Sequence, residues 1–253
     1  MILKNFLIFD GKSTVDFDCD VYGFATLNAP RRDTVNESIV GKNGEIIIDN
    51  ARLENITITY TGVIRDEDMT TSLRALRGYM LSRVGYCRLE DSFNPNEFRM
   101  ARFEGGFEIN HDRFMNKCAF DMAFNCRPER WLVDGENEVA LSSTATTLLN
   151  PTYFDAKPFF IVTGNGTITV SNDDVTYTMA LSGTSGEYYI DCENMDCYSV
   201  NTSGEYVNLN SKIVLSDTLG DYPHFPVLAG DKESSITATG FSSVSMKARW
   251  WTV

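Results

Sequence analysis

Histidine is scarce in this sequence of 253 residues, which contains only His111 and His224. Ser-His-Asp and Cys-His catalytic arrangements each need a histidine, and neither of these two lies in a recognisable catalytic motif. No C-x-x-C pair is present either, so the spacing of structural zinc ligands is missing. We therefore predict no catalytic residues, no metal site and no cofactor. The cysteines are expected to be reduced and mostly buried: Cys19, Cys87, Cys118, Cys126, Cys192 and Cys197.

Long hydrophobic runs are also missing. No segment approaches the roughly 18 consecutive apolar residues of a membrane-spanning helix, so we expect no membrane insertion. Residues 1–6 have no basic stretch before an apolar block and no small-residue cleavage site, and they do not predict a signal peptide. Hydrophobic residues make up 43% and charged residues 23% of the chain, which predicts a globular protein with a substantial core.

Basic residues are few in the second half of the chain. Residues 1–130 carry 17 Lys and Arg against 20 Asp and Glu, a net charge of −3, whereas residues 131–253 carry 5 against 15, a net charge of −10. This step is a first indication of two domains. The acidic balance argues against sequence-specific nucleic-acid binding, which depends on Lys and Arg contacts to phosphates. An acidic surface can still line a passage that DNA crosses without adhering, because like charges repel.

Short strands dominate the prediction for the first half. Asn43-Gly44 lies between the apolar segments 38–40 and 46–48, which is typical of a β-hairpin. Residues 55–64 and 118–126 alternate between apolar and polar side chains, as half-buried strands do. This alternation places Cys118 and Cys126 in line with Phe and Met, so both are expected to be core thiols.

One amphipathic helix is predicted after the acidic residues 66–68. Its apolar positions recur at three- and four-residue steps: Leu73, Leu76, Met80, Leu81 and Val84. Its solvent face is expected to carry Arg74, Arg77 and Arg83. We expect Thr70, Thr71 or Ser72 to cap the helix and Gly85 to end it.

The second half predicts an antiparallel β-sandwich of about 100 residues, because nine short strand-like segments between Phe159 and Trp251 alternate with turn sequences such as Gly164-Asn165-Gly166. A polar, Ser/Thr-rich segment, residues 136–150, precedes it. We place the boundary there, which gives domains 1–135 and 136–253.

Several local patterns recur in an order that resembles a known family. They are Phe9-Asp10-Gly11, Val40-Gly41-Lys42-Asn43-Gly44, Gly85-Tyr86-Cys87-Arg88-Leu89-Glu90-Asp91-Ser92, Asn94-Pro95-Asn96-Glu97-Phe98-Arg99-Met100-Ala101, Phe124-Asn125-Cys126-Arg127-Pro128-Glu129-Arg130-Trp131, Tyr189-Ile190-Asp191-Cys192 and Phe225-Pro226-Val227-Leu228-Ala229-Gly230. Together they span nearly the whole chain. In order and spacing they resemble the distal tail proteins (Dit) of long, non-contractile-tailed bacteriophages.

The resemblance implies a mainly β fold. Residues 1–135 would be an N-terminal, ring-forming, β-rich belt domain with one α-helix, and residues 136–253 a C-terminal galectin-like antiparallel β-sandwich. The implied function is that of a structural virion protein without enzymatic activity. Six copies would form a ring that joins the tail tube protein to a tail-associated or receptor-binding protein and leaves a central channel for DNA. The protein would be made and assembled in the host cytoplasm.

A carbohydrate-binding module is the alternative function. Trp250-Trp251 and Tyr188-Tyr189 offer aromatic side chains for stacking, but burial in the sandwich or in a subunit interface is the favoured interpretation. A galectin site also needs His, Asn and Arg beside a Trp. His224 and Arg249 are far apart in the sequence, and the pair His111 and Arg113 lies in the first half, so no sugar-binding residues are assigned.

A hydrolase is a remote third possibility. Its acid and base would come from Asp173 and Asp174, or from Asp191, Glu193 and Asp196. Both groups lie in turn-like sequence, where Asp is common for conformational reasons, and no twelve-residue calcium loop surrounds them.

For ring assembly, the contact elements we expect are the arginine side of the helix and the hairpin around residues 38–49.

Overall fold

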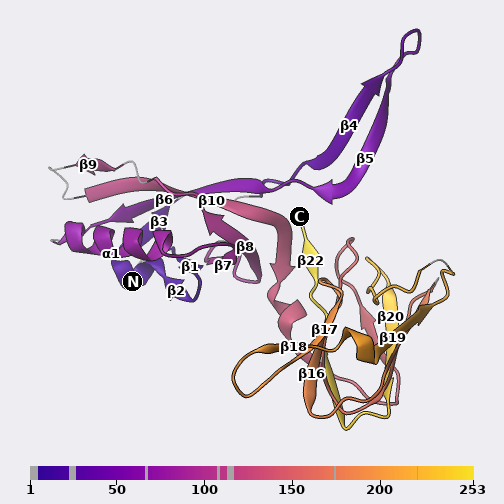
Figure 1. Ribbon diagram of the computed structural model, residues 1–253. Helices are drawn as coiled ribbons and strands as arrows, with labels where there is room; N and C mark the ends of the chain where they lie inside the picture. The colour runs from indigo at the N-terminus through magenta and orange to yellow at the C-terminus, as the bar shows by residue number, and fades with distance from the viewer. Residues whose placement is uncertain are drawn as a thin grey trace. The chain divides into compact units, whose positions relative to one another are not determined.

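Strands account for just over half of the described residues (Figure 1). The computed structural model describes residues 5–22, 27–65, 68–106, 109–112, 117–173, 175–220 and 222–253. One α-helix occurs within these ranges, so the predicted mainly β fold with a single helix is confirmed. The chain divides into two units, residues 1–130 with Val253 and residues 131–252. The roles assigned to the two predicted domains stay predictions.

The first unit is built on a sheet with the strand order β2-β1-β7-β8-β10-β6-β3, and β9 also pairs with β10. Its strands are β1 (Leu7–Phe9), β2 (Lys12–Ser13), β3 (Cys19–Tyr22), β6 (Ile56–Ile64), β7 (Cys87–Asp91), β8 (Glu97–Phe103), β9 (Asn110–Asp112) and β10 (Lys117–Leu132). A short 3-10 helix, η1 (Thr14–Phe17), connects β2 to β3.

Strand β10 organises the core of this unit. Its side chains alternate between buried and more exposed positions along most of its length, as its sequence predicts. Phe124 lies at the centre, with ring centroids 5.3 Å from Phe9, 5.4 Å from Phe103 and 6.0 Å from Tyr60. These edge-to-face contacts are geometries that aromatic pairs favour. Four strands or segments thus meet at one inward position of β10.

Helix α1 (Met69–Leu81) packs Leu76 and Met80 into this core. The prediction of its N-cap was wrong, because the carboxylate of Asp68 accepts a hydrogen bond from the Thr71 N–H. An Asp at this position accepts a hydrogen bond from an N–H group that has no partner within the helix. It also places negative charge at the positive end of the helix dipole. The helix also ends before the predicted stop, with Ser82 as its C-cap, and this leaves Val84 exposed.

A long hairpin follows the predicted pattern around Asn43-Gly44. It is formed by β4 (Arg32–Ser38) and β5 (Glu45–Leu53), which pair only with each other among the residues that the structure describes, and Gly44 has a positive φ of 87°. Positive φ in such a loop favours glycine. In Figure 1 the hairpin extends away from the sheet of the first unit.

The second unit holds two sheets that share one apolar core. One sheet has the order β11 (Glu138–Ala140), β21 (Ser243–Lys247), β13 (Phe159–Thr163), β16 (Glu187–Asp191), β17 (Asp196–Val200) and β18 (Tyr206–Asn208). The other has the order β12 (Thr146–Leu149), β20 (Glu233–Thr239), β14 (Gly166–Ser171), β15 (Thr176–Leu181) and β19 (Ile213–Asp217). All these pairs are antiparallel, as a sandwich requires.

The polar segment 136–150, where the domain boundary was placed, contains two strands that its sequence did not predict. It supplies β11 and β12, and each lies at the edge of its sheet. Edge strands tolerate polar side chains because only part of each strand is covered. The remaining elements are the 3-10 helices η2 (Val133–Glu136) and η3 (Asn210–Lys212), and β22 (Trp251–Thr252).

Two glycines of the first unit predict opposite effects of alanine. A Cβ at Gly62 in β6 would lie 2.7 Å from the Phe120 ring and 3.1 Å from the Cys19 sulfur, whereas one at Gly78 in α1 would meet nothing within 4 Å. We expect Gly62→Ala to lower the free energy of unfolding by about 1–3 kcal/mol through overpacking. Gly78→Ala should raise it by about 0.5–1 kcal/mol through helix propensity. Chemical denaturation followed by circular dichroism measures both, and equal effects would contradict this packing.

Candidate functional site

The hairpin of β4 and β5 has an apolar face that the described part of the chain leaves uncovered. Val35 pairs directly with Ile48, and Glu37 with Ile46, so these four side chains share one face. Val35, Ile46 and Ile48 keep 44%, 44% and 49% of their surface exposed. The opposite face is polar except for Ile47, which is 68% exposed. The hairpin is therefore an amphipathic ribbon without a core of its own.

Ion pairs stabilise the end of the hairpin nearest the sheet. Arg32 lies 2.9 Å from the Asp49 carboxylate, and Arg52 contacts Asp33. Asn50 also donates to Asp33 at 3.0 Å, and the hydrogen bonds from Arg52 and then Asn50 lower the pKa of that carboxyl. These cross-strand contacts flank the irregular register between Arg32 and Thr34. They keep the two strands of the hairpin together where regular strand pairing is interrupted.

An isolated two-stranded hairpin is at best marginally stable in water. This one also leaves three β-branched side chains of one face half exposed, and its tip adds Ile39 and the fully exposed Val40. Such a contiguous apolar strip on a charged chain is typical of an interaction surface. We therefore identify the face formed by Val35, Ile46 and Ile48 as the candidate functional site.

The arginine side of α1, the other expected contact element, is only partly free. Arg74 and Arg77 are exposed, as predicted. Arg83 instead forms an ion pair with Asp10 at 2.6 Å and lies over the Tyr79 ring. That ring in turn donates its hydroxyl proton to the carbonyl groups of Phe9 and Asp10. Arg83 therefore fixes the end of the helix to the β1–β2 turn.

The cysteines are free thiols, and five of the six are buried. Burial raises the pKa of Cys19 and Cys126 to about 12 and that of Cys197 to about 11. Thiols with such pKa values are protonated and unreactive near neutral pH. Within the described ranges, no three His, Cys, Asp or Glu side chains are grouped as metal ligands would be. In the same part of the chain, no helix combines the length and the apolar character needed to cross a membrane.

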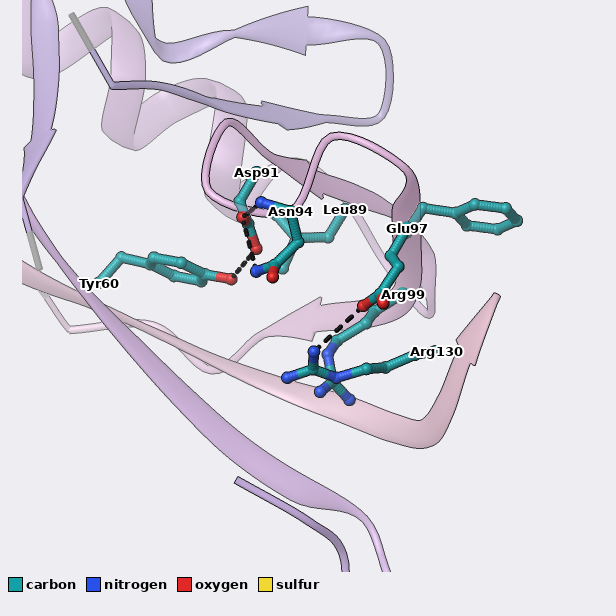
Figure 2. A pocket seen from close by; sticks show the side chains of 8 residues that line it. Tyr60, Leu89, Asp91, Asn94, Glu97, Arg99 and Arg130 are labelled. Atoms are coloured by element: carbon teal, nitrogen blue, oxygen red, sulfur yellow. Dashed lines mark hydrogen bonds and ion pairs between the residues drawn. The ribbon is translucent and has the colours of Figure 1, made fainter. Parts of the chain in front are cut away.

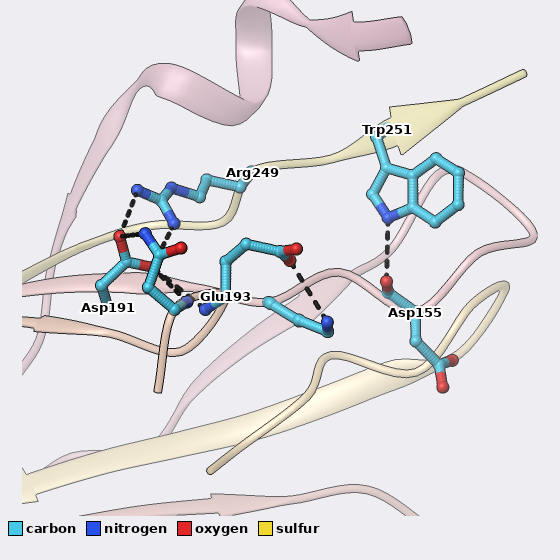
Figure 3. A network of polar contacts seen from close by, with 7 residues as sticks. Asp155, Asp191, Glu193, Arg249 and Trp251 are labelled. Atoms are coloured by element: carbon cyan, nitrogen blue, oxygen red, sulfur yellow. Dashed lines mark hydrogen bonds and ion pairs between the residues drawn. The ribbon is translucent and has the colours of Figure 1, made fainter. Parts of the chain in front are cut away.

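Three of the four rings in the two aromatic pairs of the sandwich are buried or already stacked. Trp250 and Tyr188 are buried, and the Tyr188 hydroxyl donates to the Gly164 carbonyl. Trp251 stacks on Phe154 at 4.4 Å and donates to the Asp155 carbonyl, a contact visible in Figure 3. The fourth ring, Tyr189, belongs to a row in which each ring contacts the next: Phe159, Tyr189, Tyr198 and Tyr206. These rings serve cross-strand packing.

Asp191 forms a structural ion pair with Arg249 (Figure 3). Both carboxylate oxygens face the guanidinium, at 2.7 and 3.3 Å, and Asp191 also accepts from the N–H groups of Glu193 and Asn194. Burial raises the pKa of Asp191, but the hydrogen bonds and charge of Arg249 outweigh burial and hold it below its usual value. This carboxylate is unsuited to general acid catalysis.

The other sequence candidates are scattered. His224 bonds to Asp217 through its Nδ1 at 2.9 Å, whereas Arg249 is paired with Asp191, so the two are not brought together as a sugar site. Asp174, Arg113 and the side chain of His111 lie outside the described residues. Sequence reasoning missed two buried arginines, Arg99 and Arg130, which line a small hollow (Figure 2). Strand alternation was the signal that could have located them.

The ion pair predicts a pH-dependent stability of the sandwich. Arg249→Met should lower the free energy of unfolding at pH 7 by about 3 kcal/mol, because it leaves Asp191 buried without its cation. Asp191 has a lowered folded pKa, so the contribution is present above the unfolded value of about 3.9 and is lost as the pH falls through the folded value. The difference from wild type should therefore narrow below about pH 4.

Tryptophan fluorescence measures this effect, since all three tryptophans lie in residues 131–252. Lys157→Met is the matched control, because Lys157 pairs with Glu193 at 3.3 Å on the surface. Its effect should stay under about 1 kcal/mol. A difference between wild type and Arg249→Met that is independent of pH would contradict the assignment.

Comparisons with solved structures find the same fold in phage proteins. The SPP1 Dit protein (gp 19.1), described as a paradigm of hub adsorption apparatus in phages infecting Gram-positive bacteria, matches with a TM-score of 0.68 and 13% identity, over 96% of this chain and 97% of that one. A chain of the phage p2 baseplate in its activated conformation with Sr matches with a TM-score of 0.51 and 8% identity, over 96% of each chain. No protein-family profile and no curated protein matches the sequence. The chain has a Dit-like fold, and the fold implied by the sequence resemblance is confirmed.

Proposed function

We propose that this protein is a structural component of a phage tail, a distal tail or baseplate hub without catalytic activity. The observation that carries the proposal is the fold shared with a hub protein over nearly the whole of both chains. In this function six copies form a ring. The ring joins the tail tube protein to a tail-associated or receptor-binding protein, is assembled in the host cytoplasm and becomes part of the virion.

The uncovered face of the hairpin supports assembly of this kind. In a closed ring, head-to-tail contacts place one surface of each copy against a different surface of the next. A projecting ribbon with Val35, Ile46 and Ile48 on one face suits such a contact, because burying these side chains removes apolar area from water. The ribbon then gains the packing layer that it lacks in the single chain.

The charge of the chain is compatible with a DNA channel. The net charge of −13 makes adhesion to DNA unfavourable, because bound phosphates need Lys and Arg for neutralisation. A passage lined with acidic side chains lets DNA move without being held.

Glycan binding by the second unit, the alternative function, has less support. Trp250 and Tyr188 are buried, and Trp251 already stacks on Phe154. A saccharide platform needs an aromatic face open to the ligand.

Ring assembly predicts a defined mass. A hexamer of the 28.4 kDa chain has a mass of about 170 kDa, and cyclic closure gives it a single size over a range of concentrations. Size exclusion with light scattering measures this mass. A monomer at every concentration, with or without tail tube protein, would contradict the ring.

The hairpin face predicts which side chains the assembly needs. Ile46→Ser combined with Ile48→Ser should weaken association at least roughly tenfold, since each isoleucine loses part of its contribution of about 1.5–3 kcal/mol on burial. Ile47→Ser is the matched control, because Ile47 lies between them on β5 but on the opposite face. Sedimentation velocity across a concentration series measures the effect. Equal losses in both variants would contradict the assignment of the interface to one face.

A further inference from the structure

A small hollow in the first unit contains two guanidinium groups side by side (Figure 2). It is lined by Tyr60, Leu89, Asp91, Asn94, Glu97, Phe98, Arg99 and Arg130. The free space is about the minimum that one water molecule requires, and it is partly open to solvent. The proposed function assigns no role to these residues.

Both arginines occupy positions where the strands would otherwise carry core residues. Arg99 lies on the inward side of β8, two residues before the buried Ala101. Arg130 ends the inward row of β10, four residues after the buried Cys126. The two strands are neighbours in the sheet, so their inward rows end in adjacent cations. Two buried like charges at neighbouring positions disfavour each other.

The carboxylates of the hollow are already occupied. Asp91 accepts hydrogen bonds from the Tyr60 hydroxyl, from the N–H groups of Phe93 and Asn94, and from the Asn94 side chain. Glu97 pairs with Arg130 at 3.1 Å. Each acid therefore has its own donors, and within the described residues neither forms an ion pair with Arg99, although the charge of Glu97 partly offsets the effect of burial on its pKa.

Arg99 has no hydrogen-bond acceptor for its terminal nitrogens within the described residues. Only 6% of its surface is exposed, and its two terminal nitrogens, both buried, have no hydrogen-bond partner in the described part of the chain. Burial, followed by the charge of Arg130, lowers the pKa of this guanidinium. A buried cation with unpaired donors is strongly destabilising unless an anion accepts from it.

We infer that Arg99 and Arg130 form a binding site for one carboxylate group. A carboxylate matches the two parallel N–H bonds that a guanidinium offers, and one of its oxygens suits a water-sized hollow that is open on one side and too small for a nucleotide or a sugar phosphate. The carboxylate belongs either to a free small acid or to an acidic side chain of a second copy of this chain. The inference does not depend on the proposed ring.

Calorimetric unfolding of the full chain in sodium formate tests the site, with sodium chloride at the same ionic strength as reference. Formate should raise the midpoint of the wild-type protein by roughly 2 °C or more relative to chloride. Arg99→Met should abolish this rise, and Arg99→Lys should keep only part of it. Arg102→Met is the matched control, because Arg102 lies on the same strand but is exposed and pairs with Glu104 at 3.5 Å. It should respond to formate as the wild type does.

Arg99→Met should remain folded, since an apolar side chain of similar length replaces an unpaired buried charge. A midpoint that rises with protein concentration in the wild type, but not in Arg99→Met, would support the site and place the carboxylate on a second copy. A response to formate at every protein concentration would support it and place the carboxylate on a small molecule. Equal responses to formate in the wild type and Arg99→Met, or equal effects of formate and chloride on the wild type, would overturn the inference.

Discussion

The first unit depends on the alternation of side chains along β10. Every second residue from Cys118 to Cys126 points into the core, where Phe124 meets aromatic rings from β1, β6 and β8. Because side chains of a strand alternate strictly, a shift of the register by one residue would expose this whole row. The pairing of β10 with β6 is therefore fixed by packing over nine consecutive residue pairs. The same constraint continues the inward row to Arg130 and buries a charge there.

The hairpin obeys the same alternation but has no third layer. Val35, Ile46 and Ile48 share a face just as the core residues of β10 do, yet no helix or sheet among the described residues packs on them. The ion pairs and backbone hydrogen bonds of the hairpin hold its two strands together. The three apolar side chains contribute little to its stability until another surface covers them. Periodicity in a sequence thus predicts an apolar face, and only the three-dimensional contacts reveal whether other residues of the chain bury that face.

Local sequence signals predicted the elements that local forces determine. Asn43-Gly44 located the hairpin, the three- and four-residue spacing located α1, and the turn residues located most strands of the sandwich. The errors arose where distant pairing decides the outcome. β11 and β12 were not predicted as strands because they are edge strands with polar sequence, and the burial of Arg99 depends on which strand lies beside β8. The cap at Asp68 was missed for a local reason, since three hydroxyl residues nearby are equally plausible caps.

Three carboxyl groups of the described residues have a pKa that differs from the ordinary value. The pKa values of Asp33, Asp191 and Asp217 are all lowered: by hydrogen bonds from Arg52 in the first, by Arg249 against the effect of burial in the second, and by His224 in the third. A general acid near neutral pH requires the opposite shift. Each of these anions instead connects segments that regular strand pairing does not hold: the hairpin base, the chain end of the sandwich, and the 217–224 loop. Ionised groups used in this way fix the geometry of the folded chain.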